Sequence, residues 1–309
     1  ELEPSKFWKM RRSIVGMGSI QLIVTSFLIF FLMIILGLAW QVSLAVALAF
    51  AMSSTAIVLQ TIKEKGLSST ASGQASFSVL LFQDIMVIPI LAILPLISVR
   101  GLTENRHIDS SLIGNLPGWM QGVAFFGAVA LIFLGGKYLF VPLLRIVAGT
   151  RLRELFTASS LLLVVSVALL MQVIGLSPAL GTFLAGIVLA SSEYKHELES
   201  DLDPFKGLLL GLFFIGVGAS INFELIGSKP FLILGLVAGV MMIKFAILLA
   251  TGKIFKVASD QNLLFAFALS QVGEFAFVLL SFSNQLNIID REWMDIMMAV
   301  TAITMTITP

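Results

Sequence analysis

A carboxylic acid in the middle of a strongly apolar run is the residue of this chain with the clearest chemical potential. Gln83 and Asp84 lie within "SVLLFQDIMVIPILAILP", residues 78–95, which otherwise contains apolar residues and one serine. Amide and carboxylate oxygens are hard ligands that a monovalent cation accepts in place of water. Further oxygens are offered by three consecutive hydroxyl residues, Ser53, Ser54 and Thr55. These five residues form the predicted cation- and proton-binding site.

The chemistry expected of Asp84 is a competition between a proton and a cation. Burial away from water disfavours the charged carboxylate, whereas a bound cation favours it. One site then holds either H⁺ or the cation. If both loaded forms can change their access from one side of a membrane to the other and the empty anion cannot, the protein exchanges protons for cations.

Two further charges lie deep within apolar segments. Lys244 lies in "LVAGVMMIKFAILLATG", and Glu274 follows Gln271 in "SQVGEFAFVLLS". A charge at the centre of a bilayer costs at least about 2.5–3.5 kcal/mol, so each is expected to have a use. We interpret Lys244, Glu274 and Gln271 as charge compensation at interrupted helices, because half-helix ends carry partial charges. A buried ion pair between Lys244 and Glu274 is the alternative.

The elements that hold these residues are predicted to be membrane-spanning helices. Of the 309 residues, 58% are hydrophobic and 12% are charged, and the mean hydropathy is +1.02. Such scarce charges, confined to gaps between apolar runs, are typical of an all-α polytopic membrane protein. Cysteine is absent, which excludes thiolate metal sites; no cofactor site and no nucleic-acid binding are expected. The expected spans are residues 13–36, 41–61, 70–97, 118–144, 155–175, 178–191, 206–222, 230–251, 261–283 and 292–309.

The positive charges separate when these spans are threaded alternately through a bilayer. Thirteen Lys and Arg residues fall on one side and four on the other, and two more lie within spans. By the positive-inside rule the richer side is cytoplasmic, and the visible C-terminal end lies there.

The first three spans and the last three have opposite orientations in this threading, which predicts an inverted repeat. "FAMS" at 50–53 and "FALS" at 267–270 occupy corresponding positions in the two triplets. Polar or glycine-containing residues follow each motif at mid-span, where a helix can break and free its backbone groups. The alternative is an unbroken helix with hydroxyls bonded to their own backbone. Two discontinuous, crossing helices are therefore predicted.

Four long stretches resemble the membrane domain of the Kef-type glutathione-gated potassium efflux systems, in the monovalent cation:proton antiporter superfamily. They are "SSTAIVLQTIKEKGL", "GQASFSVLLFQDIMVIPI", "LSPALGTFLAGIVLASSEYKHELESDLDPFKGLLLGLFFIGVGASINF" and "SQVGEFAFVLLS". The resemblance implies an inverted-repeat antiporter of thirteen helices. It implies a homodimer in a bacterial inner membrane, with three helices before Glu1 and a cytoplasmic nucleotide-binding domain after Pro309.

The resemblance also implies a division of labour along the chain. Residues 1–99 and 223–309 would form the core transport domain, and residues 100–222 the linker and dimerisation helices. The family's Gln-Asp pair matches Gln83 and Asp84 and is associated with potassium, whereas sodium-type relatives carry Asp-Asp or Asn-Asp there. The family's lysine matches Lys244. With glutamine in place of its aspartate partner, we expect Lys244 to be structural, Asp84 alone to titrate, and K⁺ and H⁺ to exchange one for one.

An acidic segment, "EYKHELESDLDPFKG" at residues 193–207, is predicted to be a cytoplasmic loop. Composition alone indicates a solvated connector. In the Kef-type systems the matching segment is a regulatory loop that contacts the nucleotide-binding domain, which would bind glutathione and a nucleotide, NAD(H) or AMP, and to which an ancillary flavodoxin-like subunit belongs. The corresponding regulatory residues are His196, Glu197, Glu199, Asp201 and Asp203.

Three other functions compete with potassium:proton exchange. A ligand-gated potassium channel would favour a filter of backbone carbonyls such as TVGYG, and no such stretch occurs. A sodium:proton antiporter differs from the favoured function only in its cation. An intramembrane aspartyl protease needs two carboxylates that share a proton, and Asp84 has only Glu274 as a possible mate. We therefore expect a transporter rather than an enzyme.

Overall fold

The computed structural model describes residues 4–97, 141–150, 152–174 and 193–308, with isolated positions within 127–140 and 181–189. The secondary structure of these residues is helical, which confirms the predicted all-α fold. The chain divides into two compact units. The first unit comprises residues 1–99 and 218–309, and the second comprises residues 100–217.

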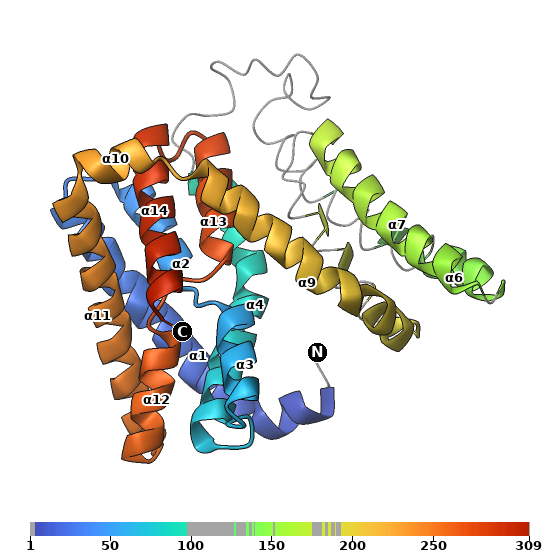
Figure 1. Ribbon diagram of the computed structural model, residues 1–309, viewed down its shortest axis with the longest axis horizontal. Helices are drawn as coiled ribbons and strands as arrows, with labels where there is room; N and C mark the ends of the chain where they lie inside the picture. The colour runs from blue at the N-terminus through green and yellow to red at the C-terminus, as the bar shows by residue number, and fades with distance from the viewer. Residues whose placement is uncertain are drawn as a thin grey trace. The chain divides into compact units, whose positions relative to one another are not determined.

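The first unit begins with a triplet of apolar segments whose middle member is interrupted (Figure 1). Gly37, with φ +85°, ends the first helix, and Gly66, with φ +67°, ends the third, because glycine adopts the left-handed backbone that closes a helix C-terminus. The helices of this triplet are α1 (Pro4–Ile35), α2 (Trp40–Ala51), α3 (Thr55–Glu64) and α4 (Ala71–Ile97).

A second triplet of the same pattern closes the chain. Its last helix is capped by Asp290, whose carboxylate accepts a hydrogen bond from the Trp293 N–H at 2.8 Å. The short helix α10 (Phe223–Ser228) precedes this second triplet. The helices of the triplet are α11 (Pro230–Ile254), α12 (Ser259–Leu269), α13 (Phe275–Gln285) and α14 (Arg291–Ile307).

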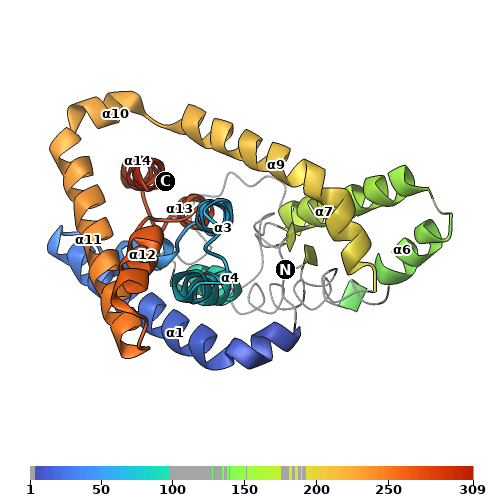
Figure 2. The ribbon, with the colours of Figure 1, turned by 60° about the horizontal axis from the view of Figure 1, so that its bottom comes forward.

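The two triplets run in opposite directions and interlock. In Figure 1 the path from α2 to α3 descends, whereas the path from α12 to α13 ascends. Helix α2 packs against α13, and α4 packs against α12. Figure 2 shows α12 between α11 and α4, with which it packs. The predicted inverted repeat with two discontinuous helices is thus confirmed.

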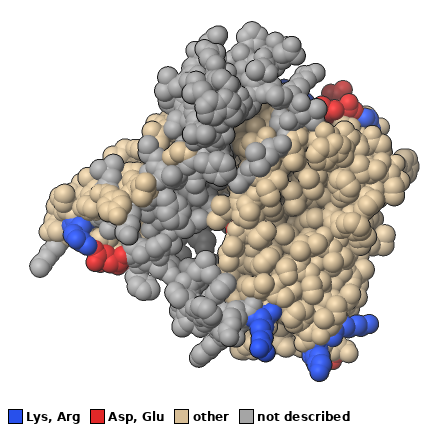
Figure 3. All heavy atoms as spheres, turned by 180° about the vertical axis from the view of Figure 1, so that it is seen from behind, with Lys and Arg blue, Asp and Glu red and all other residues tan. Residues whose placement is uncertain are grey.

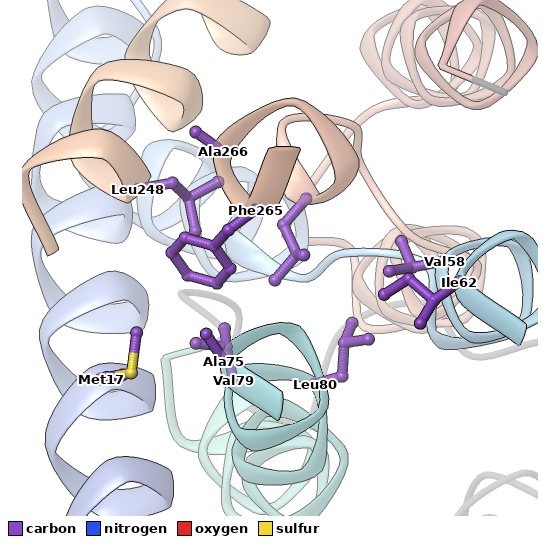
Figure 4. Close-up of a cluster of buried hydrophobic side chains, with 10 residues drawn as sticks. Met17, Val58, Ile62, Ala75, Val79, Leu80, Leu248, Phe265 and Ala266 are labelled. Atoms are coloured by element: carbon purple, nitrogen blue, oxygen red, sulfur yellow. The ribbon is translucent and has the colours of Figure 1, made fainter. Parts of the chain in front are cut away.

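Apolar side chains from both triplets share one core beside the interruptions (Figure 4). Met17 of α1 and Val79 of α4 are buried there with Leu248 of α11 and Phe265 of α12. Gly18 permits the close approach of α1 to α4, since a Cβ there would lie 2.3 Å from Phe82 Cβ. This packing holds the interruptions of the two triplets at one depth.

Five segments are long and apolar enough to cross a membrane, namely residues 12–35, 40–64, 71–95, 154–172 and 230–254. They match five of the expected spans. The last expected span, 292–309, corresponds to α14, and 261–283 corresponds to the pair α12 and α13. The expected spans 118–144 and 178–191 lie largely outside the described residues.

The second unit contains helices from the middle of the chain, and one of them corrects a prediction. The expected acidic loop at 193–207 is helical from Lys195 onward, with a turn only at Glu193 and Tyr194. Residues 195–203 contain neither glycine nor proline, and Glu197 in the first turn interacts favourably with the helix dipole. These helices are α6 (Val141–Ala148), α7 (Arg153–Ile174) and α9 (Lys195–Ser220), whose last residues belong to the first unit.

Candidate ion-binding site at the two helix breaks

The first break, residues 52–54, separates α2 from α3. Met52 and Ser54 are extended, with ψ of 145° and 110°, so the helix stops at Ala51. Helix α3 starts again where the Ser54 hydroxyl accepts a hydrogen bond from the Ile57 N–H at 3.3 Å. A break of this kind exposes backbone groups that an intact helix would pair with one another. These groups need partners from elsewhere in the fold.

The second break, residues 270–274, supplies several of those partners. The Gly273 N–H donates to the Met52 carbonyl at 3.0 Å, and the Ser53 hydroxyl donates to the Leu269 carbonyl at 2.8 Å. Gly273 is required by the approach itself, because a Cβ there would lie 2.4 Å from the Ser53 carbonyl carbon. The Val272 N–H is bound by the Thr304 hydroxyl at 3.2 Å. The two interrupted chains therefore cross in direct backbone contact.

Lys244 of α11 lies where the two breaks meet and is fully buried. Its ammonium donates to three backbone carbonyls, those of Phe50 at 3.1 Å, Met52 at 2.7 Å and Gln271 at 2.5 Å. These carbonyls lie at or just beyond the C-terminal ends of α2 and α12, which carry partial negative charge. Each proton of the ammonium thus has an acceptor, and the positive charge lies against two negative helix ends.

Glu274 stands at the opposite kind of helix end. It is the N-cap residue of α13, and its Oε1 accepts a hydrogen bond from the Ala56 N–H in the first turn of α3 at 3.5 Å. A carboxylate beside two helix N-termini is electrostatically favourable. Among the described residues no ion pair joins Glu274 to Lys244, so the alternative of a locking ion pair between them is wrong.

Gln271 contributes its backbone rather than its side chain to this arrangement. Its carbonyl accepts from Lys244, as described above, whereas its side-chain amide is fully buried. Neither amide atom has a hydrogen-bond partner within the part of the chain that the structure describes, and the same is true of Glu274 Oε2.

Asp84 of α4 lies beside the start of α3. Its Oδ1 accepts a hydrogen bond from the Thr55 hydroxyl at 3.0 Å, and the residue is partly exposed, in contrast to the fully buried Gln83 before it. The carboxylate and the hydroxyl together place two hard oxygen donors at the edge of the first break. The role of this pair as a common ligand for a cation and a proton stays a prediction.

The side chain of Gln83 holds the first break in place. Its Oε1 accepts from the Ser53 N–H at 2.8 Å, and its Nε2 donates to Gln21 Oε1 at 2.7 Å and to the Ala51 carbonyl at 3.3 Å. In this arrangement the amide oxygen is bonded to the backbone. A role of Gln83 as a cation ligand therefore stays a prediction.

Sequence reasoning missed two residues that build this site. Gln21 and Thr304 each bond to one of the breaks. The signal for Gln21 was an amide within the apolar run of α1. Thr304 carried no comparable signal. The side chains of His196, Glu199, Asp201 and Asp203 lie outside the described part of the structure, and Glu197 is exposed in the first turn of α9.

This geometry defines a class of membrane transporter. Inverted triplets, interrupted helices that cross at mid-depth and a carboxylate beside the crossing are the features of inverted-repeat secondary transporters. The whole chain, residues 1–309, matches the family described as "Sodium/hydrogen exchanger, transmembrane", and the chain belongs to that family of cation:proton exchangers. This is a family of transporters rather than enzymes.

Within this family, the chain is similar to a curated potassium-efflux protein. The chain is 43% identical over 309 residues to the glutathione-regulated potassium-efflux system protein KefC of Enterobacter sp. (strain 638). The alignment covers 100% of this chain and 48% of the relative, so the chain spans about half the length of that protein. The resemblance to the Kef-type systems is confirmed.

Proposed function

We propose that this chain is the membrane-spanning part of a potassium:proton antiporter in which K⁺ and H⁺ compete for Asp84. The observation that carries the proposal is the contact between the Asp84 carboxylate and the Thr55 hydroxyl at the edge of a helix break. Desolvation favours the protonated acid and a bound cation favours the anion. Alternating access of the site to the two sides of the membrane then moves K⁺ in one direction and H⁺ in the other.

The exchange is proposed to be electroneutral. Lys244 is fully buried and donates to three carbonyls at the helix breaks, an arrangement that favours a structural role over that of a proton carrier. Gln83, next to Asp84, carries no charge. One titrating carboxylate binds either one H⁺ or one K⁺, so each cycle moves no net charge.

The choice of potassium rests on the similar protein and on the Gln83–Asp84 pair. The relative is named a glutathione-regulated potassium-efflux system protein.

By the same likeness we propose regulation by glutathione and a nucleotide, NAD(H) or AMP, through a cytoplasmic domain, with a flavodoxin-like ancillary subunit. The acidic start of α9, residues 195–203, is the proposed contact with that domain. We propose that the first unit moves ions and that the second belongs to the linker and dimerisation helices of a homodimer.

The distribution of charge supports an orientation in the bacterial inner membrane. Figure 3 shows Lys and Arg side chains gathered at the lower end of the first unit. Helices α3 and α11 end there, with Lys63, Lys65, Lys253 and Lys256 at or just beyond their last turns. At the opposite end Lys229 forms an ion pair with Glu292. By the positive-inside rule, this distribution supports a cytoplasmic position for the lower end.

Transport by the full-length protein in sealed proteoliposomes tests this function. An imposed K⁺ gradient, with the membrane potential clamped, should change the internal pH, and no current should accompany exchange on a supported membrane. A channel would instead pass current without stoichiometric proton movement. A Na⁺ gradient tests the other cation and should drive far less proton movement.

The role of Asp84 has a matched control. Asp84→Asn should abolish exchange and remove the pH dependence of K⁺ binding, whereas Asp260→Asn, at an exposed aspartate in the first turn of α12, should leave both unchanged. Tight K⁺ binding that survives Asp84→Asn without pH dependence would remove Asp84 from the mechanism.

A further inference from the structure

A glutamine of α1 bonds the last residue of α2 directly and reaches the first break through Gln83. Gln21 is fully buried, although α1 is mostly apolar. Its Nε2 donates to the Ala51 carbonyl at 3.0 Å and to the Thr25 hydroxyl at 3.2 Å. Its Oε1 accepts from Gln83 Nε2 at 2.7 Å. Both amide hydrogens and the amide oxygen of Gln21 are therefore used.

These bonds form a continuous path from α1 through α4 into the unwound chain. It runs from Thr25 to Gln21, from Gln21 to Gln83, and from Gln83 Oε1 to the Ser53 N–H at 2.8 Å. The direction of each amide is determined, because an amide nitrogen cannot accept a hydrogen bond. Gln83 must turn its oxygen to Ser53 and its nitrogen to Gln21.

We propose that Gln21 is a positioning residue for cation binding, which acts through Gln83 and does not touch the ion; this inference rests on the proposed function. Gln83 precedes Asp84 on α4, and Ser53 lies two residues before Thr55, whose hydroxyl binds Asp84. The path therefore sets the distance between the break and the carboxylate. Cation discrimination depends on the placement of such oxygen ligands.

Among the described residues, loss of the Gln21 amide leaves Gln83 Nε2 with only its longer bond, that to the Ala51 carbonyl at 3.3 Å. The Gln83 amide and the Ser53 backbone then gain freedom, and the pair of oxygens at Asp84 and Thr55 is held less firmly. Gln21→Met preserves length and apolar packing while it removes the hydrogen bonds. Losing one buried hydrogen bond of this kind corresponds to a fall of about tenfold in affinity.

The test compares K⁺-driven proton movement in proteoliposomes of the full-length protein. Gln21→Met should raise the apparent KM for K⁺ about tenfold and lower the preference for K⁺ over Na⁺, with the maximal rate near wild type. The Tm should fall modestly, because buried partners of the amide lose their hydrogen bonds. Thr25→Val removes one acceptor of the path and should raise KM in the same direction, by roughly two- to threefold. Gln60→Met is the matched control, because Gln60 lies exposed on α3 and bonds only Glu64 among the described residues; its KM should equal that of wild type.

Each result supports or contradicts the proposed positioning role of Gln21. Unchanged KM in Gln21→Met and Thr25→Val would overturn the proposal, and so would a loss of maximal rate and Tm without a change in KM, which indicates packing alone. If Gln21→Met does not fold, the KM of Thr25→Val decides. Wild-type protein without K⁺-driven proton movement would refute the proposed function itself, whereas active wild type with unaffected variants refutes only the role of Gln21.

Discussion

The close crossing of the two breaks makes Gly273 the position at which the smallest change should have the largest effect. A methyl group there would lie 2.4 Å from both the carbonyl carbon and the carbonyl oxygen of Ser53, and 2.7 Å from the Ser54 nitrogen. Carbon atoms pack at about 3.5–4.0 Å, so Gly273→Ala must separate the two chains by about 1 Å. These three nearest atoms are all backbone, so no side-chain rotation relieves the overlap with them.

The loss in the free energy of unfolding follows from the hydrogen bonds that this separation breaks or weakens. The Gly273–Met52 hydrogen bond and the Ser53–Leu269 hydrogen bond each contribute about 0.5–1.5 kcal/mol, and weakening one charged bond from Lys244 costs about 1.5–3 kcal/mol. We expect Gly273→Ala to lower the free energy of unfolding by about 3 kcal/mol and to abolish cation:proton exchange, because the crossing is displaced from Asp84.

Denaturant titration in detergent and proton movement in proteoliposomes measure the two effects. Gly235→Ala is the matched control, because Gly235 lies within α11 with no atom within 4 Å of a Cβ at that position. It should be neutral or stabilising by about 0.5–1 kcal/mol, since alanine favours a helix more than glycine does. If Gly273→Ala unfolds and transports as Gly235→Ala does, the backbone contact between the breaks is not a feature of the folded protein.

Three other predictions test the charges of the structure. Lys244→Met removes the donor shared by three buried carbonyls, of which that of Met52 keeps the Gly273 N–H, so we expect a loss of about 2–6 kcal/mol in the free energy of unfolding by the same denaturant titration. Thr55→Val removes the hydroxyl on Asp84 while it preserves shape, and should weaken K⁺ binding about tenfold in a binding titration, with Thr306→Val, at an exposed threonine of α14, as the unchanged control. The pKa of the exposed Glu193 is lowered by its hydrogen bond to Arg145, with a further contribution from the attraction between their charges. The stabilising effect of this pair is therefore complete above the ordinary pKa of a glutamate and is lost as the pH falls through the lower pKa of the folded state. A carbon-13 NMR titration should show that lowered pKa, and Arg145→Gln should return it toward its usual value; an identical pKa in both proteins contradicts the ion pair.

Much of the fold was predictable because it depends on properties of short segments. A span is an apolar run of sufficient length, and a run such as residues 230–251 needs no knowledge of its neighbours. The two breaks were visible for a related reason, since Ser53 and Gly273 interrupt apolar helices at corresponding positions. The acidic segment from Lys195 was wrongly predicted as a loop, because its charges indicated exposure and exposure does not distinguish a helix from a loop.

The partners of the polar residues were not predictable in the same way. Lys244 and Glu274 were equally suited to an ion pair or to separate helix ends, and only their positions across the crossing separate these cases. The hydrogen bond of Gln83 to the unwound backbone at Ser53 could not be foreseen from the sequence. Gln21 gained its significance only from the packing of α1 against α4.

Without any knowledge of contacts, the apolar runs, the order of the charges and the resemblance to a known family thus predicted a helical membrane transporter with an inverted repeat and a carboxylate at mid-span. The assignment of each buried donor to its acceptor came from the way the two triplets cross. The physical reason is that hydrophobic burial depends on the character of a segment, whereas a hydrogen bond depends on the positions of two atoms to within a few tenths of an ångström. Residues such as Gln83 and Ser53, thirty positions apart, acquire those positions only in the folded chain.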